Sequence, residues 1–275
     1  MEKLIITVAP TGAWPTKKNN PNVPITPREI AEDAYRCWNA GASIVHIHVR
    51  DKDGAGTMDK ELFAEAVKLI REKCDIIINL TTSGELGATD LRRYEHLIEL
   101  KPEFASFDCG SMNWMNKGVF LNTPSFLEKL GNVMIENNIK PEIECFDSGM
   151  IYNALYYIKK GIILEPPHFQ LCLGAPSGMT AEIENLVFLR KLLPKNATWS
   201  AFGIGSKHMP ILYTTIAMGG HIRVGMEDNV FYSKGVLAQS NAQFVERAVR
   251  AGREFGREIA TPDEARNILG IKKAL

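Results

Sequence analysis

Residues 76–81, Ile76-Ile77-Ile78-Asn79-Leu80-Thr81, form a short run rich in β-branched residues and indicate the fold most clearly. Successive side chains of a strand point to opposite faces of the sheet, so three consecutive isoleucines place apolar groups on both faces. Strands buried on both faces are typical of parallel sheets covered by helices. The run therefore predicts a buried strand of a parallel sheet.

Seven similar runs occur along the chain, and stretches with helical patterning separate them. They are Leu4–Ala9, Ile44–Val49, Phe104–Asp108, Glu142–Phe146, Phe169–Leu173, Thr198–Gly203 and His221–Met226. The starts of the eight runs lie 23–40 residues apart, which matches the roughly 30 residues of one strand-plus-helix unit. Eight such units predict an α/β protein built as a closed (β/α)8 TIM barrel.

An open doubly wound sheet is the alternative architecture. We disfavour it because no GxGxxG motif follows the first run. The chain also shows no linker, low-complexity tract or composition shift that would divide it. We therefore expect residues 1–275 to form a single TIM-barrel catalytic domain.

Two helix starts carry the same signature. Thr26-Pro27-Arg28-Glu29 and Thr261-Pro262-Asp263-Glu264 each place Thr at the N-cap, Pro at the first helical position and Glu at the third. This arrangement predicts a capping box at both sites.

Composition excludes several function classes. The 275 residues contain 32 Lys and Arg against 32 Asp and Glu, whereas nucleic-acid binding depends on a surplus of basic residues. No run approaches the ~20 apolar residues of a membrane span, and the N-terminus lacks the features of a secretory signal. Five cysteines without CxxC spacing favour reduced thiols. We expect a cytoplasmic protein that binds neither nucleic acid nor membrane.

The second run contains a histidine pair, Val45-His46-Ile47-His48. Residues two apart on a strand share a face, so both imidazoles should point the same way. Active sites of such barrels lie at the carboxyl ends of the strands, where two imidazoles would suit a zinc-like divalent metal. The alternative is a pair of core histidines satisfied by internal hydrogen bonds.

The eighth run reads His221-Ile222-Arg223-Val224-Gly225-Met226-Glu227-Asp228. Alternation places Arg223 and Glu227 on the barrel axis, within reach of the histidine pair. Two histidines and one carboxylate leave coordination positions open, as catalytic sites require. Asp228 should lie at the rim as a general base, kept ionised by a nearby arginine. A buried Arg–Glu ion pair without catalytic function is the alternative.

Other strand ends are polar as well. Thr81-Thr82-Ser83-Gly84 offers hydroxyl and backbone N–H groups for a small anion. Ser106 and Asp108 alternate on the fourth run, and Glu142 and Glu144 on the fifth. Each feature alone could be a loop cap or an internal hydrogen bond. Their presence at successive strand ends favours one shared site.

Taken together, these motifs resemble the β-keto acid cleavage enzyme family. The matching segments occur in the family's order over nearly the whole chain: Thr11-Gly12-Ala13, His46-x-His48, Thr81-Thr82-Ser83-Gly84, Gly110-Ser111-Met112-Asn113, Glu142-x-Glu144 and Gly225-Met226-Glu227-Asp228-Asn229. The resemblance implies a zinc-dependent TIM barrel, usually a homotetramer, with acetyl-CoA as co-substrate. It would convert a β-keto acid into acetoacetate and an acyl-CoA.

The resemblance also assigns residue roles. It makes His46, His48 and Glu227 the zinc ligands and Asp228, oriented by Arg223, the base. Thr81, Ser106 and Glu144 fall on further polar positions of the family's site. With these assignments, Thr81, Ser83 and the N–H of Gly84 would hold the substrate carboxylate.

One position departs from the family. Members that act on amino-substituted keto acids carry an acidic residue after Thr-Gly-Ala, and this chain has Trp14 there. An indole cannot neutralise an ammonium as a carboxylate does, although it offers a cation–π face. We therefore expect Trp14 to favour neutral, apolar acyl chains, unless it only packs a loop.

Three rival interpretations remain open. Amidohydrolase-type zinc hydrolases also carry HxH on a barrel, but on the first strand, with further histidines on the fifth and sixth. A class II-type aldolase would use a metal without consuming CoA. A barrel with a purely structural metal would normally supply four ligands rather than three.

Overall fold

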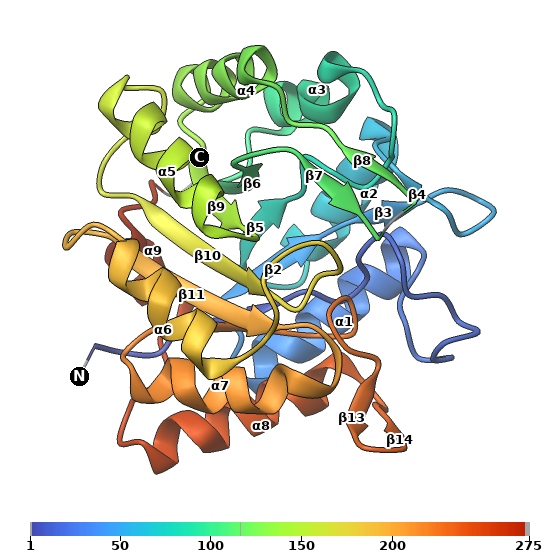
Figure 1. Ribbon diagram of the computed structural model, residues 1–275. Helices are drawn as coiled ribbons and strands as arrows, with labels where there is room; N and C mark the ends of the chain where they lie inside the picture. Colours follow the sequence, from blue (N-terminus) through green and yellow to red (C-terminus); the bar gives the residue numbers. More distant parts are fainter. Residues whose placement is uncertain (1, 116, 273–275) are drawn as a thin grey trace.

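The computed structural model describes residues 2–115 and 117–272, and its central element is a closed barrel of eight parallel strands. Around the barrel the order is β1-β12-β11-β10-β9-β6-β5-β2. The strands are β1 (Ile6–Val8), β2 (Ile44–Ile47), β5 (Ile77–Leu80), β6 (Phe104–Asp108), β9 (Lys140–Cys145), β10 (His168–Leu173), β11 (Thr198–Gly203) and β12 (His221–Val224). The predicted (β/α)8 TIM barrel is confirmed (Figure 1).

Helices between the strands cover the outside of the barrel (Figure 1). They are α1 (Pro27–Ala40), α2 (Lys60–Arg71), α3 (Asp90–Leu100), α4 (Pro124–Glu136), α5 (Ser148–Lys159), α6 (Ile183–Leu192), α7 (His208–Ala217, after the 3-10 turn Gly205–Lys207) and α8 (Asn241–Glu254), followed by α9 (Pro262–Leu269). Both predicted capping boxes are present, at Thr26 of α1 and Thr261 of α9.

Three short hairpins were not predicted. They are β3–β4 (Val49–Arg50 and Gly56–Thr57), β7–β8 (Met112–Trp114 and Gly118–Phe120) and β13–β14 (Phe231–Ser233 and Val236–Leu237). Each follows a barrel strand, so the hairpins gather at the carboxyl ends of the strands, on the right of the view in Figure 1. They extend the walls of the barrel mouth.

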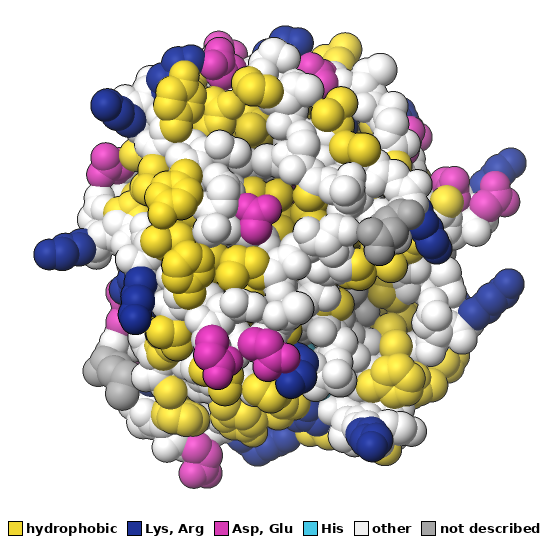
Figure 2. Space-filling view, viewed as in Figure 1, with side chains coloured by type: hydrophobic (Ala, Val, Ile, Leu, Met, Phe, Trp, Pro, Cys, Tyr) yellow, Lys and Arg dark blue, Asp and Glu magenta, His cyan; other side chains and the backbone are white. Residues whose placement is uncertain are grey.

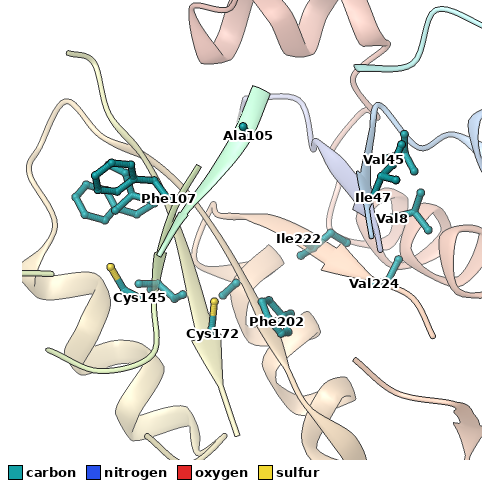
Figure 3. Close-up of a cluster of buried hydrophobic side chains, with 14 of the residues drawn as sticks. Val8, Val45, Ile47, Ala105, Phe107, Cys145, Cys172, Phe202, Ile222 and Val224 are labelled. Carbon is teal, nitrogen blue, oxygen red and sulfur yellow. The ribbon is translucent and has the colours of Figure 1, made fainter. Parts of the chain in front are cut away.

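Apolar side chains of the strands form two separate clusters. The larger one lies between the barrel and its helices and includes Val45, Ile47 and Phe107 (Figure 3). The smaller one closes the amino-terminal end of the barrel, where residues such as Ile77 and Phe104 pack against α9. Helix α9 therefore acts as the floor of the barrel.

Above this floor the barrel interior is polar. Ile76 and Ile78 join the outer cluster and Ile77 joins the floor, as a doubly buried strand requires. Asn79, next on the inward row, donates a hydrogen bond to Glu142 instead of packing against carbon. The apolar interior expected from residues 76–78 is thus confined to the amino-terminal end.

All five cysteines are free, as expected. Within residues 2–115 and 117–272, no helix is long and apolar enough to cross a membrane.

On the outer surface, α5 exposes Tyr152 and Tyr156, and α6 exposes Ile183 and Phe188. Figure 2 shows hydrophobic side chains in patches on this face, with Lys and Arg projecting mainly around its rim. The homotetramer implied by the family stays a prediction.

Gly225 lets the end of β12 pass directly against β1. Its φ is +144°, and a Cβ there would lie 2.1 Å from the carbonyl oxygen of Ala9. We expect Gly225→Ala to lower the free energy of unfolding by more than about 3 kcal/mol, because backbone strain and a backbone clash add. Denaturation in urea measures the loss.

Gly235→Ala is the matched control. Gly235 also has a positive φ, +75°, but no atom lies within 4 Å of the added Cβ. It should cost only about 1–2 kcal/mol, the strain of the left-handed backbone alone. Equal losses in the two variants would contradict the assigned close approach.

Candidate active site

A cavity of about 940 Å³ opens at the carboxyl ends of the barrel strands. His46, Asp108, Glu144, Phe202 and Arg223 bring five different strands to its floor. Its outer wall is largely apolar and comes from the loops and hairpins, with Trp14, Leu86, Trp114, Met115, Val119, Phe120, Leu121, Phe146 and Pro176. A polar floor under an apolar entrance is typical of a small-molecule site.

The two histidines face one carboxylate. The Nε2 atoms of His46 and His48 lie 3.8 and 3.5 Å from the same oxygen, Oε1 of Glu227. Their ring centroids are 5.1 Å apart, so the predicted common orientation is confirmed. Burial holds the pKa of His46 well below its ordinary value of 6.5. The ring is therefore neutral, and one of its nitrogens keeps a lone pair that can bind a cation.

Glu227 reaches this position by a route that strand alternation did not predict. The expected strand continues to Met226, but β12 ends at Val224 because Gly225 turns the backbone to a positive φ. The N–H of Glu227 then donates to the carbonyl of Ala9 at 3.2 Å. Gly12 makes room for the side chain, since a Cβ there would lie 2.5 Å from Cγ of Glu227.

Arg223 lies at the centre of the charged groups and contacts three carboxylates. Its guanidinium donates to both oxygens of Asp228 at 2.9 and 2.8 Å, to Glu227 at 2.5 Å and to Glu144 at 3.3 Å. The Phe202 ring lies below it, 4.3 Å from Cζ. Asp228 is therefore buried against Arg223, and its predicted place at the rim is wrong because the inward row ends at Gly225.

These contacts separate the pKa values of neighbouring carboxyls. Burial raises the pKa of Asp228 to about 6, although Arg223 acts in the opposite direction. Burial also favours the neutral form of Glu227, but Arg223 and the two imidazoles outweigh it and hold its pKa well below the ordinary 4.5. Glu227 is thus anionic, while Asp228 can take up a proton near neutral pH.

Asp108 belongs to the site, although the sequence indicated it only as a polar strand end. It pairs with Glu144 across β6 and β9 and lines the cavity. Burial, together with the neighbouring carboxyl, raises the pKa of Glu144 well above its ordinary value. Burial likewise raises the pKa of Asp108, and that of Glu142 to about 7. The alternation of Ser106 and Asp108 on one face was the signal that identified this position.

The predicted anion-binding loop divides into two layers. Ser83 and Gly84 line the cavity. Thr81 lies behind them, where its hydroxyl donates to the Ser83 carbonyl at 2.7 Å and accepts from the Ser83 N–H at 3.0 Å. The Ser106 hydroxyl accepts from the N–H of Thr82 at 3.0 Å. Thr81 and Ser106 therefore shape the loop, and Ser83 and Gly84 face the cavity.

Arg50, which the sequence analysis did not single out, anchors the loop that carries Trp14. Its guanidinium donates to the carbonyls of Thr11, Gly12 and Pro15 at 3.2, 2.6 and 2.8 Å. Trp14 lies on the cavity wall with 42% of its surface exposed. Trp14 therefore contributes to the cavity and does not merely pack a loop.

The donor set fits a divalent metal. Ligand atoms of His46, His48 and Glu227 lie within 4.8 Å of one another, and Oε2 of Glu227 is buried without a hydrogen-bond partner. Two imidazoles and a carboxylate suit zinc and leave positions for a substrate. Core histidines held only by internal hydrogen bonds do not explain this geometry, since the buried Nδ1 of His46 also lacks a partner.

The amidohydrolase arrangement does not occur in the described barrel. Strand β1 carries no histidine, and His168 lies at the amino-terminal start of β10, far from the mouth. The ring of His168 forms hydrogen bonds with Thr198 and Ser200 instead.

Comparisons with known proteins identify the family. The family model described as beta-keto acid cleavage enzyme matches residues 3–271. A 3-keto-5-aminohexanoate cleavage enzyme of Fusobacterium nucleatum subsp. nucleatum is 50% identical over 274 residues, covering 99% of this chain and all of the relative. A 3-oxoadipate:acetyl-CoA acetyltransferase of Cupriavidus necator is 38% identical, covering 97% and 94%.

Solved structures support the fold. The ternary complex of ObcA with a C4-CoA adduct and oxalate superimposes with a TM-score of 0.78 at 20% identity. The match covers 94% of this chain and 69% of ObcA.

Removing the central guanidinium should destabilise the barrel. We expect Arg223→Met to lower the free energy of unfolding by about 3–5 kcal/mol at pH 8, because three buried carboxylates lose their cation. The pKa values of these carboxyls then rise, so the loss should be smaller at pH 5, where the groups are protonated. Arg223→Lys keeps the charge and should lose less. Equal stability of all three proteins at pH 8 would contradict this role.

Proposed function

The chain belongs to the beta-keto acid cleavage enzyme family and is therefore an enzyme that cleaves a β-keto acid with acetyl-CoA; we propose how its residues perform that reaction. The products are acetoacetate and the CoA thioester of the remaining acyl group. The observation that carries the proposal is the network in which Arg223 joins Asp228 to Glu227 beside the two histidines. This network supports the assignment of Asp228 as a base beside a metal-binding set.

His46, His48 and Glu227 would hold a zinc ion in this proposal. The neutral state of His46 and the low pKa of Glu227 are the protonation states that metal ligands require. A zinc ion bound there supplies Lewis-acid polarisation of the substrate's keto oxygen.

Asp228 is the general base. It takes a proton from the carbon between the keto and carboxylate groups, and Arg223 orients it through both carboxylate oxygens. The resulting carbanion attacks the acetyl carbonyl of acetyl-CoA and releases CoA thiolate. The thiolate then attacks the original keto carbon, and the carbon–carbon bond breaks. Asp228 returns its proton to the departing acetoacetate carbon, so no protein nucleophile is needed.

The substrate carboxylate would lie against Ser83 and the N–H of Gly84, which line the cavity beside His48. Thr81 and Ser106 act one layer behind and hold the loop in shape. Glu144 accepts from Nη1 of Arg223, whereas Asp228 accepts from Nε and Nη2, so Glu144 helps to orient the guanidinium. The volume of about 940 Å³ leaves space for the acyl chain and the thioester end of acetyl-CoA.

Trp14 and its apolar neighbours favour a neutral acyl chain. The Lys117 ammonium lies 6.0 Å from the centroid of the Trp14 ring. Among the described residues, this lysine already supplies a cation beside the indole. The name of the Fusobacterium relative points to an amino-substituted substrate for that enzyme. For this chain, activity measurements decide between a neutral and an amino-substituted acyl chain.

Mass spectrometry of the products tests the proposed reaction. The zinc-loaded protein is incubated with acetyl-CoA and a panel of β-keto acids with neutral, anionic and ammonium-bearing chains. Acetoacetate formed together with one new acyl-CoA supports the proposal. Cleavage without any CoA product would favour a hydrolase or an aldolase and overturn it.

Replacement of the base should slow the reaction strongly. We expect Asp228→Asn to lower kcat by about 10²–10⁴-fold, because an amide cannot accept the proton. Asp75→Asn, at the opposite end of the barrel next to Arg266, should leave kcat unchanged. Near-normal turnover by Asp228→Asn would refute the base assignment.

The pH profile should report the same carboxyl. Asp228 acts as the carboxylate, so kcat/KM should rise with pH until the group is ionised and then level off. Its pKa of about 6 is an upper bound for this break, since a bound cation lowers it further.

Trp14 should control the acyl-chain preference. We expect Trp14→Glu to raise kcat/KM for an ammonium-bearing chain relative to a neutral one by more than about tenfold, because a carboxylate can pair with the ammonium. Trp14→Gln, which changes the size and polarity without adding charge, is the control. If the parent already turns over the ammonium-bearing substrate fastest, the preference assigned to Trp14 is wrong and the reaction stands.

A further inference from the structure

The ring of His46 has a second nitrogen that the metal-binding set does not use. Its Nε2 faces Glu227, whereas Nδ1 points toward β9 and lies 3.9 Å from Oε2 of Glu142. Both Nδ1 of His46 and Oε1 of Glu142 are buried and lack a hydrogen-bond partner. An imidazole nitrogen and a carboxyl group therefore face each other inside the barrel, closest through the oxygen that also accepts from Asn79, and the proposed chemistry uses neither of them.

Glu142 is itself held in place. Asn79 donates from Nδ2 to Oε2 of Glu142 at 2.6 Å. Asn79 lies beside His46 in the register of β2 and β5, and Glu142 lies beside Ser106 in that of β6 and β9. Glu142 is fully buried, so its carboxyl belongs to the rigid barrel interior rather than to a mobile loop.

An imidazole that binds a metal through Nε2 carries its proton on Nδ1. That N–H normally donates to a carboxylate or carbonyl, which fixes the tautomer and the orientation of the ring and strengthens metal binding. Around the buried ring of His46, Glu142 supplies a carboxyl acceptor on the Nδ1 side. A carboxyl group can accept at one oxygen in either protonation state, so the arrangement does not depend on the charge of Glu142.

We propose that Glu142 is a positioning residue for the metal site: it accepts the Nδ1 proton of His46 and so directs Nε2 toward the ion. This inference rests on the proposed metal site and extends it to a residue outside the ligand set. Glu142 does not contact the substrate, because it is absent from the described lining of the cavity.

Two other arrangements of the same atoms compete with this one. His46, Glu142 and Glu144 also lie close enough to form a metal-binding group, but that group omits His48, whose Nε2 is 3.5 Å from Glu227. Oδ1 of Asn79 is also buried without a partner and is a neutral acceptor near the ring. A carboxylate is the stronger acceptor for an imidazole N–H.

Zinc affinity of the full-length protein, measured by competition with a chromophoric chelator, tests the proposal without relying on activity. We expect Glu142→Gln to weaken zinc binding about 10–100-fold. The oxygen of the Gln amide remains with Asn79, and a neutral amide oxygen is a weaker acceptor for the Nδ1 proton than a carboxylate oxygen. Asn79→Ala should weaken binding less, because the carboxylate stays. Ser200→Ala, which removes a buried hydroxyl that bonds Gln170 and His168, should leave affinity unchanged.

The cobalt-substituted protein supplies a second readout. Its visible spectrum should keep the same ligand bands in Glu142→Gln at saturating metal, because His46, His48 and Glu227 remain the ligands. If Glu142→Gln does not fold, as judged by circular dichroism, Glu142→Asp keeps the carboxyl but withdraws it from His46. The zinc affinity of Glu142→Asp should then lie between those of the parent and His46→Ala.

The outcomes separate this inference from the proposed function. Tight binding by the parent, loss in His46→Ala and parental affinity in Glu142→Gln would overturn the role of Glu142 alone. A larger loss in Asn79→Ala than in Glu142→Gln would make Asn79 the acceptor. Equal, weak binding by the parent and His46→Ala would refute the metal site itself and this inference with it.

Discussion

One guanidinium has to compensate a cluster of buried carboxyls at the mouth of the barrel. Arg223 contacts Glu144, Glu227 and Asp228, and its charge also acts on the nearby carboxyls of Asp108 and Glu142. Buried charges without partners are costly, so the cluster must adjust by pairing, by protonation or by binding a cation. Pairing is visible in the contacts of Arg223, and protonation is favoured by the raised pKa values of Asp108, Glu142 and Glu144. In the proposed function, the histidine pair and Glu227 supply the site for a cation.

This division of charge explains how neighbouring carboxyls acquire different roles. Glu227 touches both Arg223 and the imidazoles and stays anionic, as a metal ligand must. Asp228 shares the same arginine but keeps a pKa of about 6, which suits a group that takes a proton and returns it. In the proposed mechanism, these two adjacent residues take different roles because their surroundings shift their pKa values in opposite directions.

Geometry at the barrel mouth depends on close backbone approaches between neighbouring loops. Gly225 passes against Ala9, Gly12 makes room for Glu227, and Arg50 ties the Thr11–Pro15 segment to the barrel. The groups assigned to the proposed reaction therefore lie on barrel strands and tightly packed turns. The apolar entrance comes from Trp14 and the β7–β8 hairpin, where substitutions can change the substrate without disturbing the charged floor.

Local sequence patterns determined much of this protein. The eight runs, both capping boxes, the inward pair His46 and His48 and the polar strand ends were readable because strand alternation and helix capping act over a few neighbouring residues. The Trp14 substitution was also visible in the sequence. The family resemblance added the roles that spacing alone left open.

Only the tertiary structure decided where the last catalytic groups lie. Alternation placed Asp228 at the rim, but Gly225 ends β12 early, and the turn against Ala9 carries Asp228 into the barrel to Arg223. The roles of Arg50, Asp108 and Glu142 likewise depend on partners from distant strands. A short sequence pattern encodes which face a side chain takes, whereas the contact between two faces depends on how the whole barrel closes.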